Sequence, residues 1–276
     1  MTSLIPFVGF TGDYLSSAFF LFGIVFGPFI LFAFVIHLLE QTIQRVLAER
    51  FGWKSVMWTG WLGTPIHELS HVVMCHLFRH RVDEVALFEP DPASGRLGFV
   101  RHSWRKGNWF EELGTVFIGI APLIGGSVAL CLLLWLFYPL ATESAFLPTE
   151  NSSGSVNAIM SSVTAIFSQI LNLDNFLSLK FWVFVYLALC IASHMAPSKS
   201  DYQGAKKTSV FIVFVTALAG CLLATSSSDP RAVAETTIQL LSPLFAILMI
   251  SVLLCLLATV AVTLIVSRFP KRYTVR

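Results

Sequence analysis

Residues 61–78 read WLGTPIHELSHVVMCHLF, with the pattern HExxH at 67–71. Residues four apart lie on one face of a helix, so His67 and His71 can both point a ring nitrogen at one zinc ion. Glu68 would then lie beside the open coordination position, where it can take a proton from a water molecule. An apolar helix that buried these three groups by coincidence would leave them without partners, at a cost in free energy. We therefore expect a zinc site with Glu68 as its general base.

The composition is that of a membrane protein. The chain has 276 residues, of which 55% are hydrophobic and only 12% are charged, whereas soluble domains carry about 25% charged residues. The net charge of +2 is too small to indicate a nucleic-acid partner. The five cysteines lie in apolar segments without paired spacing, which argues against a disulfide framework or a thiolate metal site. The expected environment is a lipid bilayer.

The apolar segments predict an all-α polytopic fold with about six transmembrane helices. A small β-hairpin is expected between the zinc helix and the next span, with strands at 85–89 and 97–101 around the turn sequence PDPASG. Residues 40–54 have a helical pattern and could lie along the membrane surface. His37 and Glu40 are expected at the interface, and a direct role at the site is the less favoured alternative. A further short amphipathic helix is expected near 156–171. The six predicted spans are 15–39, 56–78, 109–140, 179–196, 209–225 and 238–266.

Basic residues predict the orientation in the membrane. Thirteen of the eighteen lie in 79–106, 199–207 and 268–276, and none lies in 141–178. The positive-inside rule puts the three basic segments in the cytoplasm. We expect an integral protein of a bacterial plasma membrane, with its site near the cytoplasmic face. Whether the zinc helix crosses fully or is re-entrant stays open, with a full crossing preferred.

A catalytic zinc usually has three protein ligands, so a third must come from elsewhere in the chain. Asp201 is the best candidate, because it follows a break in the fourth span at Pro197. The alternative is that Asp201 is an ordinary loop acid that caps the next helix. His194 is the second candidate, either as a ligand or as a hydrogen-bond partner of one. Glu111 or Glu112 would be a less favoured third ligand.

The order of these features resembles the site-2 protease family of intramembrane zinc metalloproteases. An HExxH helix is followed by a strand-forming segment, by a span with the small-Pro motif Ala121-Pro122, and by a span that ends in APSKSD at 196–201. The similarity covers about residues 56–210. Two departures mark a divergent, minimal member: Tyr202-Gln203 separates the Asp from a glycine, and Gly125 stands where the family has an asparagine.

The resemblance implies a division of the chain and an activity. Residues 1–55 would form the first span and an interfacial segment, 56–210 a metalloprotease-like core, and 211–276 two C-terminal spans. The implied reaction is zinc-dependent hydrolysis of a peptide bond of a membrane-protein substrate, in or near the membrane. Two other classes remain open, a non-catalytic membrane protein with a structural metal site and a transporter. The oligomeric state is not predicted.

Overall fold

The computed structural model describes residues 5–146, 155–198, 201 and 230–273. This part of the chain is mostly helical and contains one two-stranded antiparallel sheet, as expected. The predicted span at 209–225 lies outside the described residues. In chain order the elements are α1 (Ile5–Phe51), η1 (Trp53–Val56), α2 (Met57–Leu77), β1 (Arg81–Ala86), β2 (Phe99–Ser103), α3 (Trp109–Gly119), α4 (Ala121–Phe137), α5 (Pro139–Phe146), α6 (Ser155–Ile170), α7 (Leu173–Phe176), α8 (Leu179–Ala192) and α10 (Pro230–Val266).

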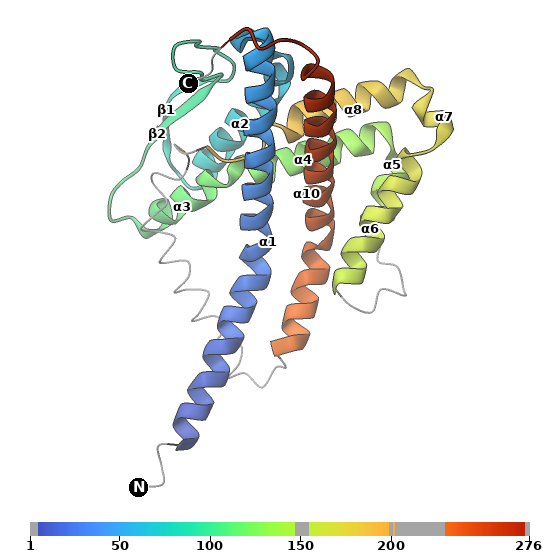
Figure 1. Cartoon of the computed structure of the whole chain (residues 1–276). Coiled ribbons are helices and arrows are strands. Elements are labelled where there is room, and N and C mark those ends of the chain that lie inside the picture. Colours follow the sequence, from blue (N-terminus) through green and yellow to red (C-terminus); the bar gives the residue numbers. More distant parts are fainter. Residues whose placement is uncertain (1–4, 147–154, 199–200, 202–229, 274–276) are drawn as a thin grey trace.

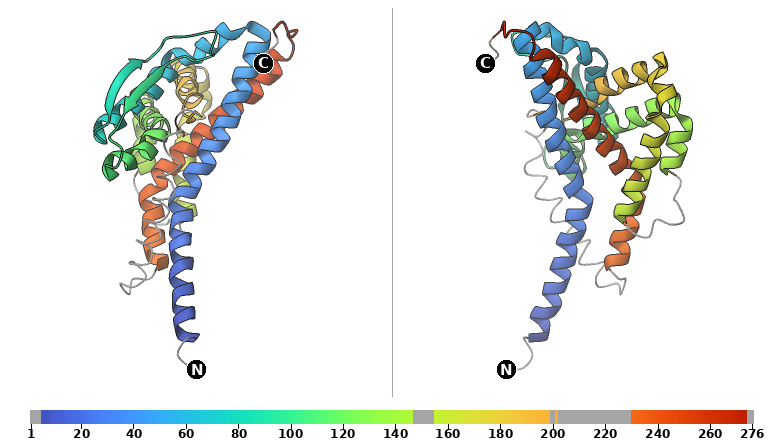
Figure 2. Two further views of the ribbon diagram at one scale, coloured as in Figure 1. Left: turned by 90° about the vertical axis from the view of Figure 1, so that its left-hand side faces the viewer. Right: turned by 45° about the vertical axis from the view of Figure 1, so that its right-hand side comes forward.

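Helices α1 and α10 lie side by side and form the long axis of the molecule (Figures 1 and 2). Helix α1 has 47 residues and continues through Pro28, so it is about 70 Å long. Residues 40–54 form no separate surface helix, because α1 runs on to Phe51. The reason is packing: Ile43 and Leu47, four apart, lie against Val266 of α10.

The described residues contain two helical segments that are long and apolar enough to span a membrane, Ile30–Phe51 and Leu244–Leu264. The bent pair α3 and α4, which meet at 56°, makes a third if the two helices count as one span. The expected number of about six is therefore not reached in this part of the chain. Helix α8 has 14 residues and a length of about 21 Å, short of the roughly 30 Å hydrocarbon layer. Helix α2 has the length, but polar side chains interrupt its apolar surface.

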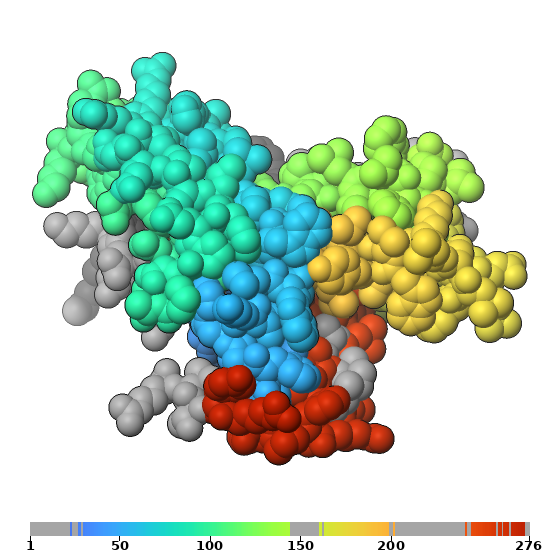
Figure 3. Space-filling view, turned by 90° about the horizontal axis from the view of Figure 1, so that it is seen from above, coloured from blue at the N-terminus to red at the C-terminus, as the bar shows by residue number. Residues whose placement is uncertain are grey.

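Helices α4 and α8 run across the direction of α1 and α10 rather than along it (Figures 1 and 3). They pack on each other through buried apolar side chains such as Leu130 and Leu134 of α4 and Phe184 and Ala188 of α8. The predicted amphipathic helix is confirmed as α6, which buries Ile166 in the same cluster. Apolar composition predicted that these segments are separate membrane spans, but α8 is too short to be one and α4 qualifies only together with α3.

The predicted hairpin is confirmed, although β1 begins four residues earlier and β2 ends two residues later than expected. Val85 pairs with Val100, and the register shifts by one residue between Val82 and Glu84. In the connecting loop, Asp91 accepts hydrogen bonds from the Ala93 amide at 3.0 Å and the Ser94 hydroxyl at 2.6 Å. These bonds lower the pKa of Asp91. The hairpin is thus fixed by local turn chemistry.

The hairpin and the C-terminal segment lie at the same end of the molecule, beside the end of α1 (Figure 3). Lys271 forms an ion pair with Glu49 at 2.7 Å, and the amide of Arg272 donates to the Glu49 carbonyl. Two of the three basic segments expected on one side of the membrane therefore lie at the same end of the molecule. Their orientation relative to a bilayer stays a prediction.

Candidate metal site

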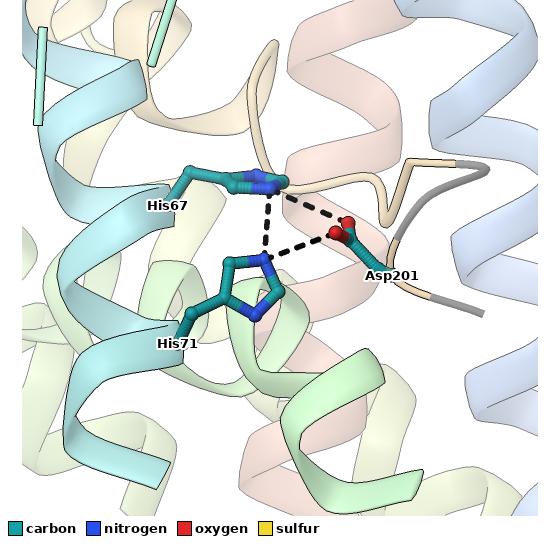
Figure 4. A group of neighbouring side chains, drawn as sticks. All are labelled: His67, His71 and Asp201. Carbon is teal, nitrogen blue, oxygen red and sulfur yellow. Dashed lines mark hydrogen bonds and ion pairs between the residues drawn. The ribbon is translucent and has the colours of Figure 1, made fainter. Parts of the chain in front are cut away.

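Helix α2 places His67 and His71 one turn apart on the same face, as the spacing predicted. Their Nε2 atoms are 3.2 Å apart and point toward Asp201 (Figure 4). The Asp201 carboxylate oxygens lie 3.5 Å from His67 Nε2 and 3.4 Å from His71 Nε2. The structure thus brings Asp201 close to two histidines that lie 134 and 130 positions earlier in the sequence.

Backbone carbonyls fix the orientation of both imidazoles. His67 Nδ1 donates to the carbonyl of His194, and His71 Nδ1 donates to the carbonyl of Ile118, each at 2.8 Å. A carbonyl can only accept, so each Nδ1 carries a proton and, in the neutral ring, each Nε2 is an acceptor. Two acceptor nitrogens therefore face each other. A hydrogen bond from one ring nitrogen to a backbone carbonyl is typical of histidines that bind a metal through the other nitrogen.

Helix α8 ends at Ala192, four residues before the predicted end of this span at residue 196. Asp201 lies in the segment that follows. The amide of Ser198 donates to Asp201 Oδ2 at 2.6 Å and orients the carboxylate. This hydrogen bond helps to aim the carboxylate at Nε2 of His67 and of His71.

Two glycines of α3 and α4, Gly119 and Gly125, allow close approach of the Asp201 segment and of α2. A Cβ atom on Gly119 would lie 2.8 Å from the main-chain oxygen of Asp201, too close for any other residue. On α4, a side chain at Gly125 would overlap Ser70 of α2. Gly119 and Gly125, on either side of Ala121-Pro122, thus permit close approach at two sides of the site.

The donor set has the composition of a metal site. One nitrogen or oxygen atom from each of His67, His71 and Asp201 lies within 4.8 Å of the other two. Acceptors that converge without a donor between them repel each other, and a cation relieves that repulsion. The group could therefore hold a metal ion.

Glu68 is buried beside this group and lines a cavity of about 780 Å³ with it. Residues 95–102 of the hairpin form the opposite wall. A Cβ atom on Gly98 would lie 2.9 Å from Glu68 Cγ, so the glycine permits the hairpin to pass directly over this side chain. Glu68 therefore faces a space that is large enough for a polypeptide segment.

The ring of His194 is not part of the three-residue group. Its Nδ1 lies 3.1 Å from the carbonyl of Cys190, and its Nε2 is buried without a hydrogen-bond partner among the described residues. The expected support from His194 comes instead from its main-chain carbonyl, which orients His67. The choice between the two candidates for a third group thus falls on Asp201.

Glu111 is used elsewhere, and Glu112 is not in the group either. The buried Glu111 carboxylate accepts from the backbone amide of Arg105 at 2.6 Å, from its guanidinium at 2.5 and 2.8 Å, and from Asn108 at 3.0 Å. Glu111 hydrogen-bonds to Arg105 and raises its pKa. Sequence reasoning left both acids open as ligands, and the structure assigns Glu111 to the start of α3.

Two histidines near the cavity form a pair of their own. His80 Nε2 donates to the carbonyl of Glu111 at 2.6 Å, and its Nδ1 lies 3.0 Å from Nδ1 of His102. Burial, followed by the electrostatic effect of the neighbouring His80, lowers the pKa of His102 to about 4. Neither belongs to the group of possible metal ligands among the described residues.

Sequence reasoning missed one polar residue that lines the cavity and disfavoured a place there for another. Thr64 lies one turn before His67 on α2, and its buried hydroxyl has no hydrogen-bond partner in the described part of the chain. Glu40 of α1 was expected at the membrane interface but lines the cavity. The spacing along α2 could have indicated Thr64. No local signal indicates Glu40, because its place depends on how α1 packs.

Comparison of the chain with protein-family models, with curated proteins and with solved structures finds no match. The site is therefore interpreted from its own geometry.

Proposed function

We propose that this protein is a zinc metalloprotease that hydrolyses a peptide bond of a membrane-protein substrate in or near the bilayer. The observation that carries the proposal is the convergence of His67, His71 and Asp201 with Glu68 beside them. Three protein ligands and an adjacent carboxylate are the components of a catalytic rather than a closed structural zinc site.

The distances support zinc as the metal. Ligand atoms about 2.0–2.1 Å from a tetrahedral zinc ion are roughly 3.3 Å apart. The nitrogen–nitrogen distance in the group is 3.2 Å, and the nitrogen–oxygen distances are 3.4 and 3.5 Å. Two imidazoles and one carboxylate are also a ligand set that zinc accepts.

The residues would divide the reaction between them. A zinc ion bound by the three ligands would supply Lewis acidity for the scissile carbonyl and for the attacking water. Glu68 takes a proton from that water as its oxygen forms a bond to the carbonyl carbon. The same carboxyl then gives the proton to the leaving nitrogen as the carbon–nitrogen bond breaks, so no proton is gained or lost.

The hairpin offers a place for an extended substrate segment. Its strand β2 and the preceding residues 95–98 form a wall of the cavity that contains Glu68. A transmembrane helix has no free backbone groups, so a scissile segment must unwind before hydrolysis. An unwound segment would gain backbone hydrogen bonds by adding to β2 as a strand.

Glu68→Gln tests the proposal. Membranes that contain the parent protein, Glu68→Gln or the control Glu84→Gln would be compared by mass spectrometry for new N-termini of membrane proteins. Glu84 is an exposed residue of β1 that pairs with Arg101. We expect the parent and Glu84→Gln to share N-termini that are missing with Glu68→Gln. The same set with Glu68→Gln would remove Glu68 from the chemistry and favour a structural metal site.

A further inference from the structure

Glu40 is a half-buried residue on the wall of the cavity of the candidate metal site, and its carboxyl group has no charge partner among the described residues. It lies on α1, within the candidate membrane span Ile30–Phe51. Gln44 donates to its Oε1 at 2.8 Å, which holds the side chain in one orientation. The other oxygen, Oε2, is buried and has no hydrogen-bond partner among the described residues. No ion pair between described residues includes Glu40.

The position of Glu40 indicates that its role is to bind a ligand rather than to stabilise the fold. A polar atom removed from water without a partner is unfavourable, and more so at membrane depth. Packing alone would be served by an apolar side chain, as at the neighbouring buried positions Ile36 and Ile43 of α1. Glu40 lines the same cavity as His67. Its missing partner is therefore one that enters this cavity.

A second metal ion does not fit this role. Among the described residues, the group of three or more possible metal ligands that lie close together is His67, His71 and Asp201, without Glu40. Glu40 has one free carboxylate oxygen and the amide of Gln44 beside it. A divalent ion needs more protein oxygens than this. One free oxygen suits an ammonium or guanidinium group, which donates hydrogen bonds and carries the opposite charge.

We propose that Glu40 forms a subsite for a positively charged side chain of the substrate, a lysine or arginine next to the scissile bond. This inference rests on the proposed function, because the cavity must admit a polypeptide. Lysine and arginine gather where transmembrane segments meet the cytoplasm, which is the depth expected for this site. Their long side chains can lie along apolar surface and place the charge at a polar group. Glu40 would then select which segment presents its backbone to the metal.

The subsite can be tested without a known substrate. Short peptides that end in a hydroxamate chelate zinc, so their binding reports on the metal site whether or not the protein cleaves anything. Two such peptides would differ only in one side chain, lysine or its uncharged isostere norleucine, placed in turn at the two residues nearest the hydroxamate. Their affinities for the zinc-loaded protein in detergent would be measured by calorimetry for the parent, Glu40→Gln, Glu40→Asp and the control Glu84→Gln.

We expect the parent to bind the lysine peptide about 10- to 100-fold more tightly than the norleucine peptide, the range for a desolvated charged hydrogen bond. Glu40→Gln should lose this preference while it keeps its zinc and its affinity for norleucine. Glu40→Asp should keep part of the preference, and Glu84→Gln all of it.

Equal affinities in the parent, or a preference that survives in Glu40→Gln, would overturn the subsite and leave the proposed protease intact. If neither peptide binds in a zinc-dependent way, the metal site fails, and the subsite fails with it. The comparison of the two peptides on the parent decides the point even if Glu40→Gln does not fold.

Discussion

Two hollows that are lined by described residues differ in character. The cavity of about 780 Å³ between α2 and the hairpin is lined by acids and histidines, among them Glu40, Glu68 and Asp201. The groove of about 350 Å³ between α4, α6, α8 and α10 is lined by apolar residues, and Leu134, Phe184 and Ile247 are examples. Buried polar groups are unfavourable unless they have partners, whereas an apolar groove costs little in a bilayer. The contrast assigns chemistry to the first hollow and helix packing to the second.

The largest expected effect is on the rate of cleavage, which should depend on the cavity and not on the apolar groove. Glu68→Gln should lower the rate of cleavage by about 10²–10⁴-fold, because glutamine cannot accept the proton. Leu134→Ala, in the apolar groove, should leave the rate per folded molecule unchanged. The measurement is the rate of appearance of the N-termini found with the parent, at equal amounts of folded protein. Equal losses in the two variants would break the comparison.

The free energy of unfolding, by contrast, should depend on side chains of the apolar groove. Phe184 is buried between α4 and α8 and meets Tyr138 edge to face, with ring centroids 5.2 Å apart. Phe184→Ala should lower the free energy of unfolding by about 3–5 kcal/mol without changing the metal content. Leu136→Ala, at an exposed position of α4, should stay within about 0.5 kcal/mol. Unfolding in detergent would be followed by circular dichroism; a small effect of Phe184→Ala would show that the groove is not tightly packed.

A smaller effect should come from the contact between Gly119 and the Asp201 loop. Gly119→Ala would place a Cβ atom 2.8 Å from the Asp201 carbonyl and displace the carboxylate. We expect about a 10- to 100-fold loss of metal affinity, the range for disturbed support of a ligand. Gly27→Ala is the matched control, since nothing lies within 4 Å of its Cβ position. Competition with a chelator of known affinity measures the change, and equal affinities in the two variants would contradict the assigned role of Gly119.

The smallest effect concerns pH. The pKa of His102 is lowered from 6.5 to about 4 in the folded protein. The folded state therefore binds fewer protons than the unfolded state between these values, and stability falls as the pH falls from 6.5 toward 4. Because His102 is only partly buried, we expect the loss to be about 1 kcal/mol rather than the full value of the shift. His102→Gln should reduce the change of the melting temperature with pH in this range, whereas His76→Gln, at an exposed position, should not. Identical pH profiles for the parent and His102→Gln would contradict the shift.

Local patterns predicted the parts of the structure that depend on neighbouring residues. The spacing within HExxH predicted that His67 and His71 share a face, and α2 extends from Met57 to Leu77, close to the predicted 56–78. Turn residues predicted the hairpin, and Pro197 indicated a break near the end of α8. The proximity of Asp201 to the histidines was also predicted, because a break at that depth favours a polar group that reaches inward.

Features that depend on long-range packing were not predictable in this way. Apolar composition does not distinguish burial in lipid from burial in protein, so α4 and α8 were taken as crossing helices although they run across α1 and α10 (Figure 1). Glu40 looked interfacial because the residues that follow it are polar. The apolar stripe of Ile43 and Leu47 against α10 turns Glu40 into the cavity instead.

The zinc content of the purified protein tests the central claim most directly. Elemental analysis in detergent should find about one zinc per chain in the parent and in the exposed control His76→Ala, and very little in His67→Ala and His71→Ala. A metal-free parent would contradict the claim and would make the group an ion pair between protonated histidines and Asp201. Equal zinc in His67→Ala, His71→Ala and the parent would place the metal elsewhere.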